Sequence, residues 1–299
     1  MEKVLITGAT GFLGKEIVGF FKSENFEVKT LSRSLSDYNI SLEKSIPLFD
    51  LEFDLVIHAA GKAHIVPKNK EERDEFYAVN VKGTENLLNA LESSNLKKFV
   101  FISSVSTYGL KQGVLINEST PLLAKDPYGK SKILAEKMIQ EWCEKRNVKC
   151  TVLRLPLLVG KNPPGNLGSM IRSINKGHFF TIGGGIASKS MLLTSDVARV
   201  IPMVSEFGGV YNITDGYNPT FRELSNAFEL SYNKKVFDLP LFPFKVLAFM
   251  GDRLSFIPFN SNMLNKIILN FSFDDSKLKN TVNSWKPTPI LDFLKKTVI

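Results

Sequence analysis

The chain has 299 residues, of which 43 % are hydrophobic and 23 % charged; these values are ordinary for globular proteins and exclude disordered, collagen-like and low-complexity classes. At about 150 residues per domain, this length predicts one large domain or two moderate ones. The net charge of +8 is compatible with nucleic acid, an anionic membrane surface or a small phosphorylated ligand, and does not choose among them.

Cysteine usage and hydropathy indicate the compartment. Cys143 and Cys150 are too few for a disulfide framework, which favours a reducing environment. The apolar run Val4–Ile6 is too short for a signal-peptide core. The most hydrophobic stretch, Leu239–Phe259, is interrupted by prolines and charged residues. We therefore expect a cytoplasmic protein without an integral membrane segment.

Short β-rich runs alternate with helical patterns through the first half of the chain, which is typical of βαβ units with a parallel sheet. Strands are predicted at Val4–Ile6, Glu27–Leu31, Leu55–His58, Phe99–Ser103 and Lys149–Leu153. Helices are predicted from Leu13 onward, at Asn80–Leu91 and at Ser131–Lys145. This order predicts an α/β fold with a doubly wound parallel sheet of the Rossmann type.

The alternation loosens after Gly160, where loop signals appear. A strand and a helix capped by Asp196 are predicted within Met191–Val204, followed by a strand at Val210–Ile213. We expect residues 1–160 and about 190–215 to form the Rossmann domain. Residues 161–189 and 216–299 would form a smaller C-terminal cap that binds the substrate.

The end of the chain leans towards helix and is rich in Phe and Lys. The stretch Phe242–Phe259 has two interpretations, core packing of the cap or an amphipathic contact with a membrane, and we favour core packing.

A glycine-rich turn, Thr7–Gly14, follows the first strand and opens the first helix, where a dinucleotide pyrophosphate would meet a helix N-terminus. Gly8 permits the tight turn, Gly11 lets the backbone approach phosphates, and Gly14 lets helix and strand pack closely. The spacing is one residue longer at the front than the commonest fingerprint. A ligand-free turn is the alternative, which this context disfavours.

The end of the second strand bears on the cofactor. NAD-binding chains carry an acidic residue there for the ribose hydroxyls, whereas a nearby arginine accommodates a 2′-phosphate. This sequence has no acid at that place and Arg33 stands next to it, which favours NADP over NAD. A solvated surface arginine is the alternative.

Three residues suggest acid–base chemistry. Tyr128 and Lys132 are four positions apart at the start of a predicted helix, so they share one face. An adjacent ammonium would lower the pKa of the phenol. Ser104 ends the fourth strand, at the carboxyl edge where α/β proteins bind ligands, and its hydroxyl could orient a carbonyl. The Tyr-x-x-x-Lys pattern alone is common in solvated helices.

The combination is far more specific. The glycine-rich turn, His58–Gly61, Asn80–Thr84, Ser104 and Tyr128-x-x-x-Lys132 occur in this order. Together they resemble the extended short-chain dehydrogenase/reductase family over about residues 3–215. Within that family the sequence is most similar to bacterial nucleotide-sugar 4-ketoreductases and 4-epimerases.

The resemblance implies roles for these residues. Tyr128 would be the catalytic acid or base, Lys132 its partner and a ribose contact, and Ser104 the hydroxyl that positions the carbonyl. Asn80 would support the helix that carries the active site. The adenine would contact Asn39 and Ile40, where the family has an aspartate and an aliphatic residue. The implied cofactor contacts are Gly8, Thr10, Gly11, Phe12, Leu13, Gly14, Arg33, Asn39, Ile40, Ala59, Ala60, Gly61, Asn80, Tyr128, Lys132 and Pro156. No metal is implied.

Substrate contacts are also implied by the resemblance, at Ser104, Ser106, Asn166 and Lys189. Where 4-epimerases usually have Arg-x-x-Asn, this chain reads Arg154-Leu155-Pro156-Leu157 and lacks the asparagine. A branch that reduces UDP-4-keto-6-deoxy-N-acetylhexosamines has a similar leucine, and Asn166 and Ile182–Gly185 match its loop and glycine-rich segment. Lys189 takes the place of an arginine there and keeps a positive charge for a diphosphate.

The resulting expectation is NADP(H)-dependent reduction of a UDP-linked 4-keto nucleotide sugar, of the UDP-4-keto-6-deoxy-N-acetylhexosamine type, in surface-polysaccharide precursor synthesis, with Tyr128 as proton donor. The alternative is a 4-epimerase that keeps NAD tightly bound. A non-catalytic sensor would not need Ser104, Tyr128 and Lys132 together. Nucleic-acid binding lacks a basic run with interleaved aromatics. The resemblance also implies a homodimer.

Overall fold

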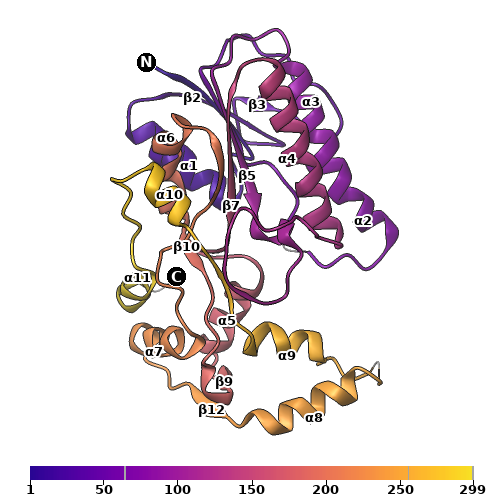
Figure 1. The fold of residues 1–299 in the computed structure, drawn as a ribbon, viewed down its shortest axis with the longest axis vertical. Helices are drawn as coiled ribbons and strands as arrows, with labels where there is room; N and C mark the ends of the chain where they lie inside the picture. The colour runs from indigo at the N-terminus through magenta and orange to yellow at the C-terminus, as the bar shows by residue number, and fades with distance from the viewer. Residues whose placement is uncertain (64, 255, 298–299) are drawn as a thin grey trace.

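The computed structural model describes residues 1–63, 65–254 and 256–297, with Asn166 described by its backbone alone. Its centre is a seven-stranded sheet in the order β11-β7-β5-β4-β1-β2-β3, with every pairing parallel (Figure 1). The strands are β1 (Lys3–Thr7), β2 (Glu27–Ser32), β3 (Tyr38–Asn39), β4 (Leu55–His58), β5 (Lys98–Ser104), β7 (Lys149–Leu155) and β11 (Gly209–Asn212). The predicted parallel sheet is confirmed, and each strand predicted for it is present.

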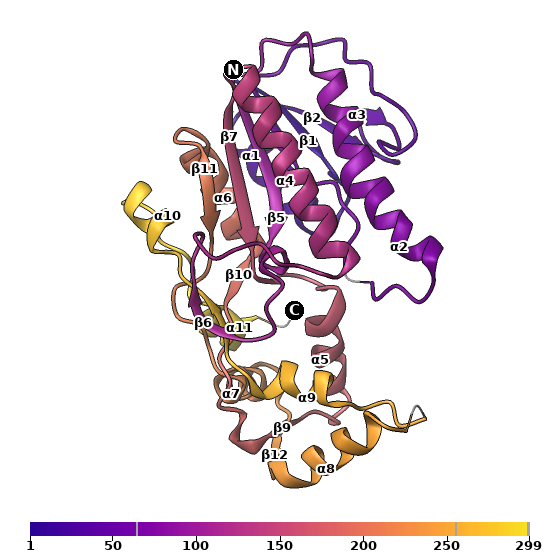
Figure 2. The same cartoon turned by 45° about the vertical axis from the view of Figure 1, so that its right-hand side comes forward.

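Helices cover both faces of the sheet, as a doubly wound fold requires. One face is covered by α1 (Phe12–Ser23) and α6 (Thr194–Ser205), and the other by α3 (Gly83–Ala90) and α4 (Pro127–Lys145). Figure 2 shows α4 running along the strands beside α3. A further helix, α2 (Lys70–Tyr77), joins α3 through a π-helical turn, η1 (Ala78–Lys82).

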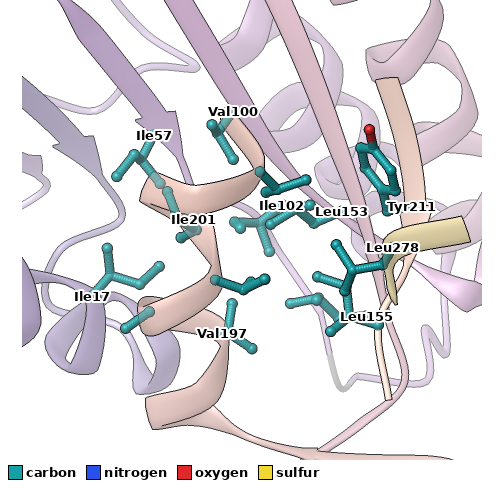
Figure 3. Packing of buried hydrophobic residues seen from close by; sticks show 14 of the residues in the cluster. Ile17, Ile57, Val100, Ile102, Leu153, Leu155, Val197, Ile201, Tyr211 and Leu278 are labelled. Atoms are coloured by element: carbon teal, nitrogen blue, oxygen red, sulfur yellow. The ribbon is translucent and has the colours of Figure 1, made fainter. Parts of the chain in front are cut away.

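The core on the α1/α6 face includes a segment from the end of the chain. Ile17 of α1 and Val197 of α6 lie in one cluster with residues of β4, β5 and β7 (Figure 3). The same cluster contains Leu278 of α10 (Ser276–Thr281), Val282 and Trp285. The C-terminal segment therefore returns to the central sheet after α8 and α9.

Helix α6 begins one turn earlier than predicted. Its N-cap is Leu193, so the expectation that Asp196 caps this helix is wrong. Asp196 is buried in the first turn, where its carboxylate accepts hydrogen bonds from Thr288 N at 2.6 Å and Arg199 Nη1 at 2.7 Å. Asp196 thus ties α6 to the C-terminal segment.

Outside the central sheet, three two-stranded parallel ladders join segments far apart in sequence. They pair β8 (Leu157–Val159) with β10 (Met191–Leu193), β9 (Phe180–Ile182) with β12 (Phe237–Leu239), and β6 (Gly113–Ile116) with β13 (Phe271–Phe273). The remaining elements are η2 (Val105–Tyr108), α5 (Gly165–Asn175), η3 (Gly183–Gly185), α7 (Phe221–Tyr232) and α11 (Ile290–Lys296).

At the end of the molecule far from β1, α8 (Leu241–Gly251) and α9 (Ser261–Ile268) lie side by side (Figure 1). Leu241, Phe244 and Ala248 face a small cluster with Leu264 and Ile182. The other side of α8 is in solvent, with Phe242 75 % and Phe249 56 % exposed. The expected core packing of this stretch is therefore wrong for half of α8, because only one face of the helix has a partner. Among the described residues, no helix is long and apolar enough to cross a membrane.

Candidate active site

The glycine-rich turn packs against the loop after β4. Gly8 has a φ of +68°, and a Cβ there would lie 2.6 Å from Ala60 N. A Cβ on Gly14 would lie 2.1 Å from the carbonyl oxygen of Gly8. Side chains at either position would therefore displace the turn or the loop, which explains both glycines.

The turn leaves the N-terminus of α1 open. Gly11 is the N-cap and provides no side-chain acceptor for the first-turn N–H groups of the helix. Gly11 N itself donates to Gly8 O at 2.9 Å. Thr10, Phe12 and Leu13 lie at this terminus. Free N–H groups and the helix dipole suit a phosphate, so the residues present fit the pyrophosphate of a nicotinamide dinucleotide.

A buried histidine fixes the loop after β4. Ala60 N donates to Thr7 Oγ1 at 3.2 Å, and this hydroxyl lies 2.7 Å from His58 Nδ1. On the other side, His58 Nε2 lies 2.9 Å from Thr84 Oγ1, which donates to Asn80 O at 2.7 Å. Because the Thr84 hydroxyl donates its hydrogen to Asn80 O, His58 Nε2 must donate to Thr84 Oγ1. His58 Nδ1 therefore accepts from the Thr7 hydroxyl. Burial lowers the pKa of His58 to about 3, so this ring stays neutral and structural.

Asn80 connects that loop to the helix that carries Tyr128 and Lys132. Its Oδ1 accepts from Lys62 N at 2.7 Å, and its Nδ2 donates to Lys62 O at 3.1 Å and to Ser131 Oγ of α4 at 2.9 Å. Between them, Gly61 is so close that a Cβ would lie 3.1 Å from Asn80 Oδ1 and 3.2 Å from Lys132 Nζ. The loop after β4 is therefore in direct contact with both Asn80 and Lys132.

Helix α4 begins four residues earlier than predicted. Asp126 is its N-cap and accepts from Gly129 N at 3.0 Å, with Pro127 in the first helical position. This start places Tyr128 and Lys132 in the first turns, on the face towards the sheet.

Ser104 and Tyr128 meet at the carboxyl edge of the sheet. The Ser104 hydroxyl donates to Ser106 Oγ at 3.2 Å and accepts from Ser106 N at 3.1 Å. Burial raises the pKa of Tyr128 above its ordinary value; the neighbouring Ser104 hydroxyl opposes this, and the charge of Asp126 adds to it. The expected lowering by Lys132 is absent, so at neutral pH the phenol carries its proton.

Lys132 is buried beside this pair. Its Nζ donates to Ile102 O at 2.9 Å and lies 4.5 Å from the centre of the Phe101 ring. Burial lowers its pKa to about 8, against the opposing charge of Glu136.

Glu136 is a buried neighbour of Lys132 that the sequence reasoning missed. It lies one turn beyond Lys132, is 1 % exposed, and accepts from Arg154 Nη2 at 2.7 Å and from Ser103 Oγ. Arg154 Nη1 continues to Tyr108 Oη at 3.2 Å. A signal was present: Glu136 follows Tyr128 and Lys132 at a spacing of four, on the inner face of α4.

The end of β2 carries a cation, Arg33, and the carboxylate of Glu43 lies close enough for the two charges to interact. Arg33 follows the strand and is exposed. The nearest carboxylate along the chain, Asp37, accepts from Thr30 N at 2.8 Å and Thr30 Oγ1 at 2.6 Å. Asn39 pairs with Ser32 in the β2–β3 ladder, and Ile40 N donates to Ser32 O at 2.8 Å. The residues expected around the adenosine half therefore border one strand end.

The residues expected to contact the substrate do not all lie together in the structure. Ser106 stands with Ser104, but Lys189 Nζ donates to Leu269 O at 2.7 Å and lies 5.8 Å from the centre of the Phe271 ring. Burial lowers the pKa of Lys189 to about 8. The side chain of Asn166 lies outside the described residues.

Two other expected positions can be placed. Pro156 is buried between β7 and β8, and Leu157 begins β8 opposite Met191. The described part of the chain contains no cluster of three or more His, Cys, Asp or Glu side chains able to hold a metal.

The family model described as "NAD dependent epimerase/dehydratase family" matches residues 4–214. The chain belongs to this family. The match spans the glycine-rich turn, Ser104, Tyr128 and Lys132, and confirms the resemblance on which their expected roles rest.

Three similar proteins illustrate the range of this epimerase/dehydratase family. An N-acetyl-alpha-D-glucosaminyl-diphospho-ditrans,octacis-undecaprenol 4-epimerase from Escherichia coli O157:H7 is 30 % identical over 79 % of this chain and 74 % of its own length. A UDP-glucose 4-epimerase from Vibrio cholerae is 24 % identical over 97 % of this chain and 92 % of its own. The structure of RMD from Pseudomonas aeruginosa complexed with NADPH has a TM-score of 0.74 at 22 % identity, covering 99 % of this chain and 97 % of that one.

Proposed function

We propose that this protein reduces the 4-keto group of a nucleotide sugar, of the UDP-4-keto-6-deoxy-N-acetylhexosamine type, with NADPH. The observation that carries the proposal is the placement of Ser104, at the end of β5, beside Tyr128 in the first turn of α4, at the carboxyl edge of the sheet. Both hydroxyls lie there beside Lys132 and within the domain that the glycine-rich turn opens.

The chain's own groups have distinct tasks in this reaction. When bound, NADPH supplies the hydride that reduces the carbonyl carbon. Ser104 Oγ–H donates a hydrogen bond to the carbonyl oxygen, and Tyr128 Oη–H transfers its proton to that oxygen as negative charge develops. Lys132, held by Ile102 O, lies beside the site as a cation that stabilises the phenolate left behind.

Leu157 supports reduction over epimerisation, because it stands where the 4-epimerases have an asparagine.

Arg33 supports NADPH as the cofactor, because it is exposed at the end of β2 while Asp37 is bound to Thr30. Arg33→Ala should lower kcat/KM for NADPH at least about tenfold through the lost phosphate contact, and change that for NADH less than about twofold. Lys22→Ala, which removes an exposed cation from α1, serves as the control. Equal losses with both cofactors would contradict an NADPH preference.

A 4-epimerase is the second candidate, because the two curated relatives described above carry that name. The two reactions differ in cofactor balance. A reductase consumes NADPH in proportion to the keto sugar, whereas an epimerase retains NAD and consumes none. Incubation of the purified protein with a panel of 4-keto and 4-hydroxy nucleotide sugars therefore separates them.

A further inference from the structure

The outer face of α8 is apolar and has no partner within the described chain. Phe242, Val246 and Phe249 follow one another at helical spacing on this face, opposite the packed residues Leu241, Phe244 and Ala248. They are 75 %, 45 % and 56 % exposed. Side chains on either flank and on the loop after α8 extend the same surface: Leu247, Met250, Leu254 and Phe256.

This face stands at one extremity of the molecule. Figures 1 and 2 both place α8 at the end of the structure opposite the N-terminus. Large exposed aromatic residues on a protruding helix suit insertion into a soft apolar phase better than they suit binding of a small ligand.

Basic side chains lie on α8 and on the segments next to it in the sequence. Lys245 and Arg253 share helical spacing with Phe242 and Phe249, while Lys234 and Lys235 are exposed on the loop before β12 and Lys266 is exposed on α9. None of these five forms an ion pair with another described residue. Arg253 stacks on Phe249, with 3.6 Å between its guanidinium carbon and the ring centre.

The acids nearest to α8 in the sequence, Glu229, Asp238 and Asp252, each accept hydrogen bonds, and Glu229 accepts from Val236 N at 2.5 Å. Asp238 accepts from Thr181 Oγ1 at 2.7 Å and from Gly184 N at 2.9 Å. Asp252 accepts from Ser261 N at 3.0 Å and Ser261 Oγ at 2.5 Å. The surface around α8 is therefore apolar at its centre and positive at its edges.

The charge of the whole chain follows the same distribution. Outside residues 161–189 and 216–299, basic and acidic residues are equal in number, so these two segments carry the entire net charge of +8. The second of these two segments contains α8.

From these observations we infer that the outer face of α8 docks on an anionic lipid bilayer, with Phe242, Phe249 and Phe256 in the interfacial layer and the surrounding cations against the headgroups. A second copy of the chain is a poorer occupant, because a two-fold contact through α8 would bring the same unpaired cations together. Anionic headgroups neutralise them. Docking through α8 is compatible with a reductase and with a 4-epimerase, so it does not depend on the proposed function.

The test is flotation of the full-length protein with vesicles of phosphatidylcholine containing roughly one third phosphatidylglycerol, and with vesicles of phosphatidylcholine alone. The wild type should float with the anionic vesicles and bind the neutral ones at least about tenfold more weakly. Added salt should weaken the anionic binding.

Phe242→Ser, Phe249→Ser and Phe256→Ser combined should lower the partition coefficient at least about tenfold. The matched control combines Leu48→Ser, Phe207→Ser and Leu230→Ser, which are 88 %, 59 % and 70 % exposed elsewhere and should leave flotation unchanged. Unfolding transitions of both variants should stay near that of the wild type, because all six side chains are exposed.

Three results would overturn the inference. The wild type could stay with the unbound protein, or the triple Phe variant could float as well as the wild type. Sedimentation could also show a wild-type dimer that the triple Phe variant loses, without any flotation; a second copy would then cover α8.

Discussion

Tyr128 and Lys132 lie one turn apart on α4, and burial moves both towards their neutral forms. It raises the pKa of the phenol and lowers the pKa of the ammonium to about 8. A buried cation of this kind costs stability, which the protein tolerates at a site that needs the charge.

Lys132→Met tests this cost. The pKa falls from 10.5 to about 8 on folding, so the unfolded chain binds the proton more tightly between these values. Wild-type stability must therefore rise with pH across that window. Met removes the charge, so at neutral pH the variant should be more stable by up to about 3 kcal/mol, and the gap should narrow above pH 8.

Urea unfolding at several pH values measures that gap. Lys130→Met, at an exposed position of the same helix, is the control and should change little. A variant Lys132→Met that is less stable than the wild type by the same amount at every pH would contradict the assignment.

The order of strands and helices in the sequence predicted that Ser104 ends a strand and that Tyr128 and Lys132 share one helix face, and the structure has them so; their roles follow from the resemblance and stay a prediction. Glu136 could not be predicted in the same way. A glutamate within an amphipathic helix is usually solvated, and only the partner Arg154, on β7, shows that this one is buried.

At the scale of elements, the glycine-rich turn depends on close contact between β1, α1 and the loop after β4. Gly14→Ala places a Cβ 2.1 Å from Gly8 O, so the turn must move. We expect NADPH binding at least about tenfold weaker and a lower unfolding midpoint, measured by titration and urea unfolding.

Gly19→Ala is the control in the same helix. Its Cβ would meet nothing within 4 Å, and alanine favours helix, so this variant should gain about 0.5–1 kcal/mol and bind NADPH as the wild type does. Normal NADPH binding by Gly14→Ala would show that the turn does not hold the cofactor.

The central strands were predictable because each is a buried apolar run. The short strands were not: β3 has two residues, and β9 and β12 pair across more than fifty positions of sequence. The exposure of Phe242 and Phe249 was missed for a related reason, since hydropathy does not reveal whether a partner covers a helix face.

At the scale of the whole molecule, the C-terminal segment joins the core of the central sheet. Leu278 is fully buried in the cluster of Ile17 and Val197. Leu278→Ala should lower the free energy of unfolding by about 2–5 kcal/mol, whereas Leu48→Ala, at an exposed position, should change it little.

The two tryptophans report on different parts of the chain. Trp142 lies on α4, and Trp285 lies in the C-terminal segment. Trp142→Phe and Trp285→Phe each leave one tryptophan, and Leu278→Ala should lower the fluorescence midpoint of both proteins by the same amount. A shift seen only by Trp285 would show that the segment unfolds alone.

The most direct test of the central claim follows NADPH and sugar together, using a UDP-4-keto-6-deoxy-N-acetylhexosamine as substrate. The wild type should consume one NADPH for each keto sugar reduced. Tyr128→Phe should lower kcat at least about a hundredfold while leaving NADPH affinity within about twofold, because only the proton donor is lost. Undiminished NADPH oxidation by Tyr128→Phe, or 4-epimer formation by the wild type without NADPH consumption, would contradict the account.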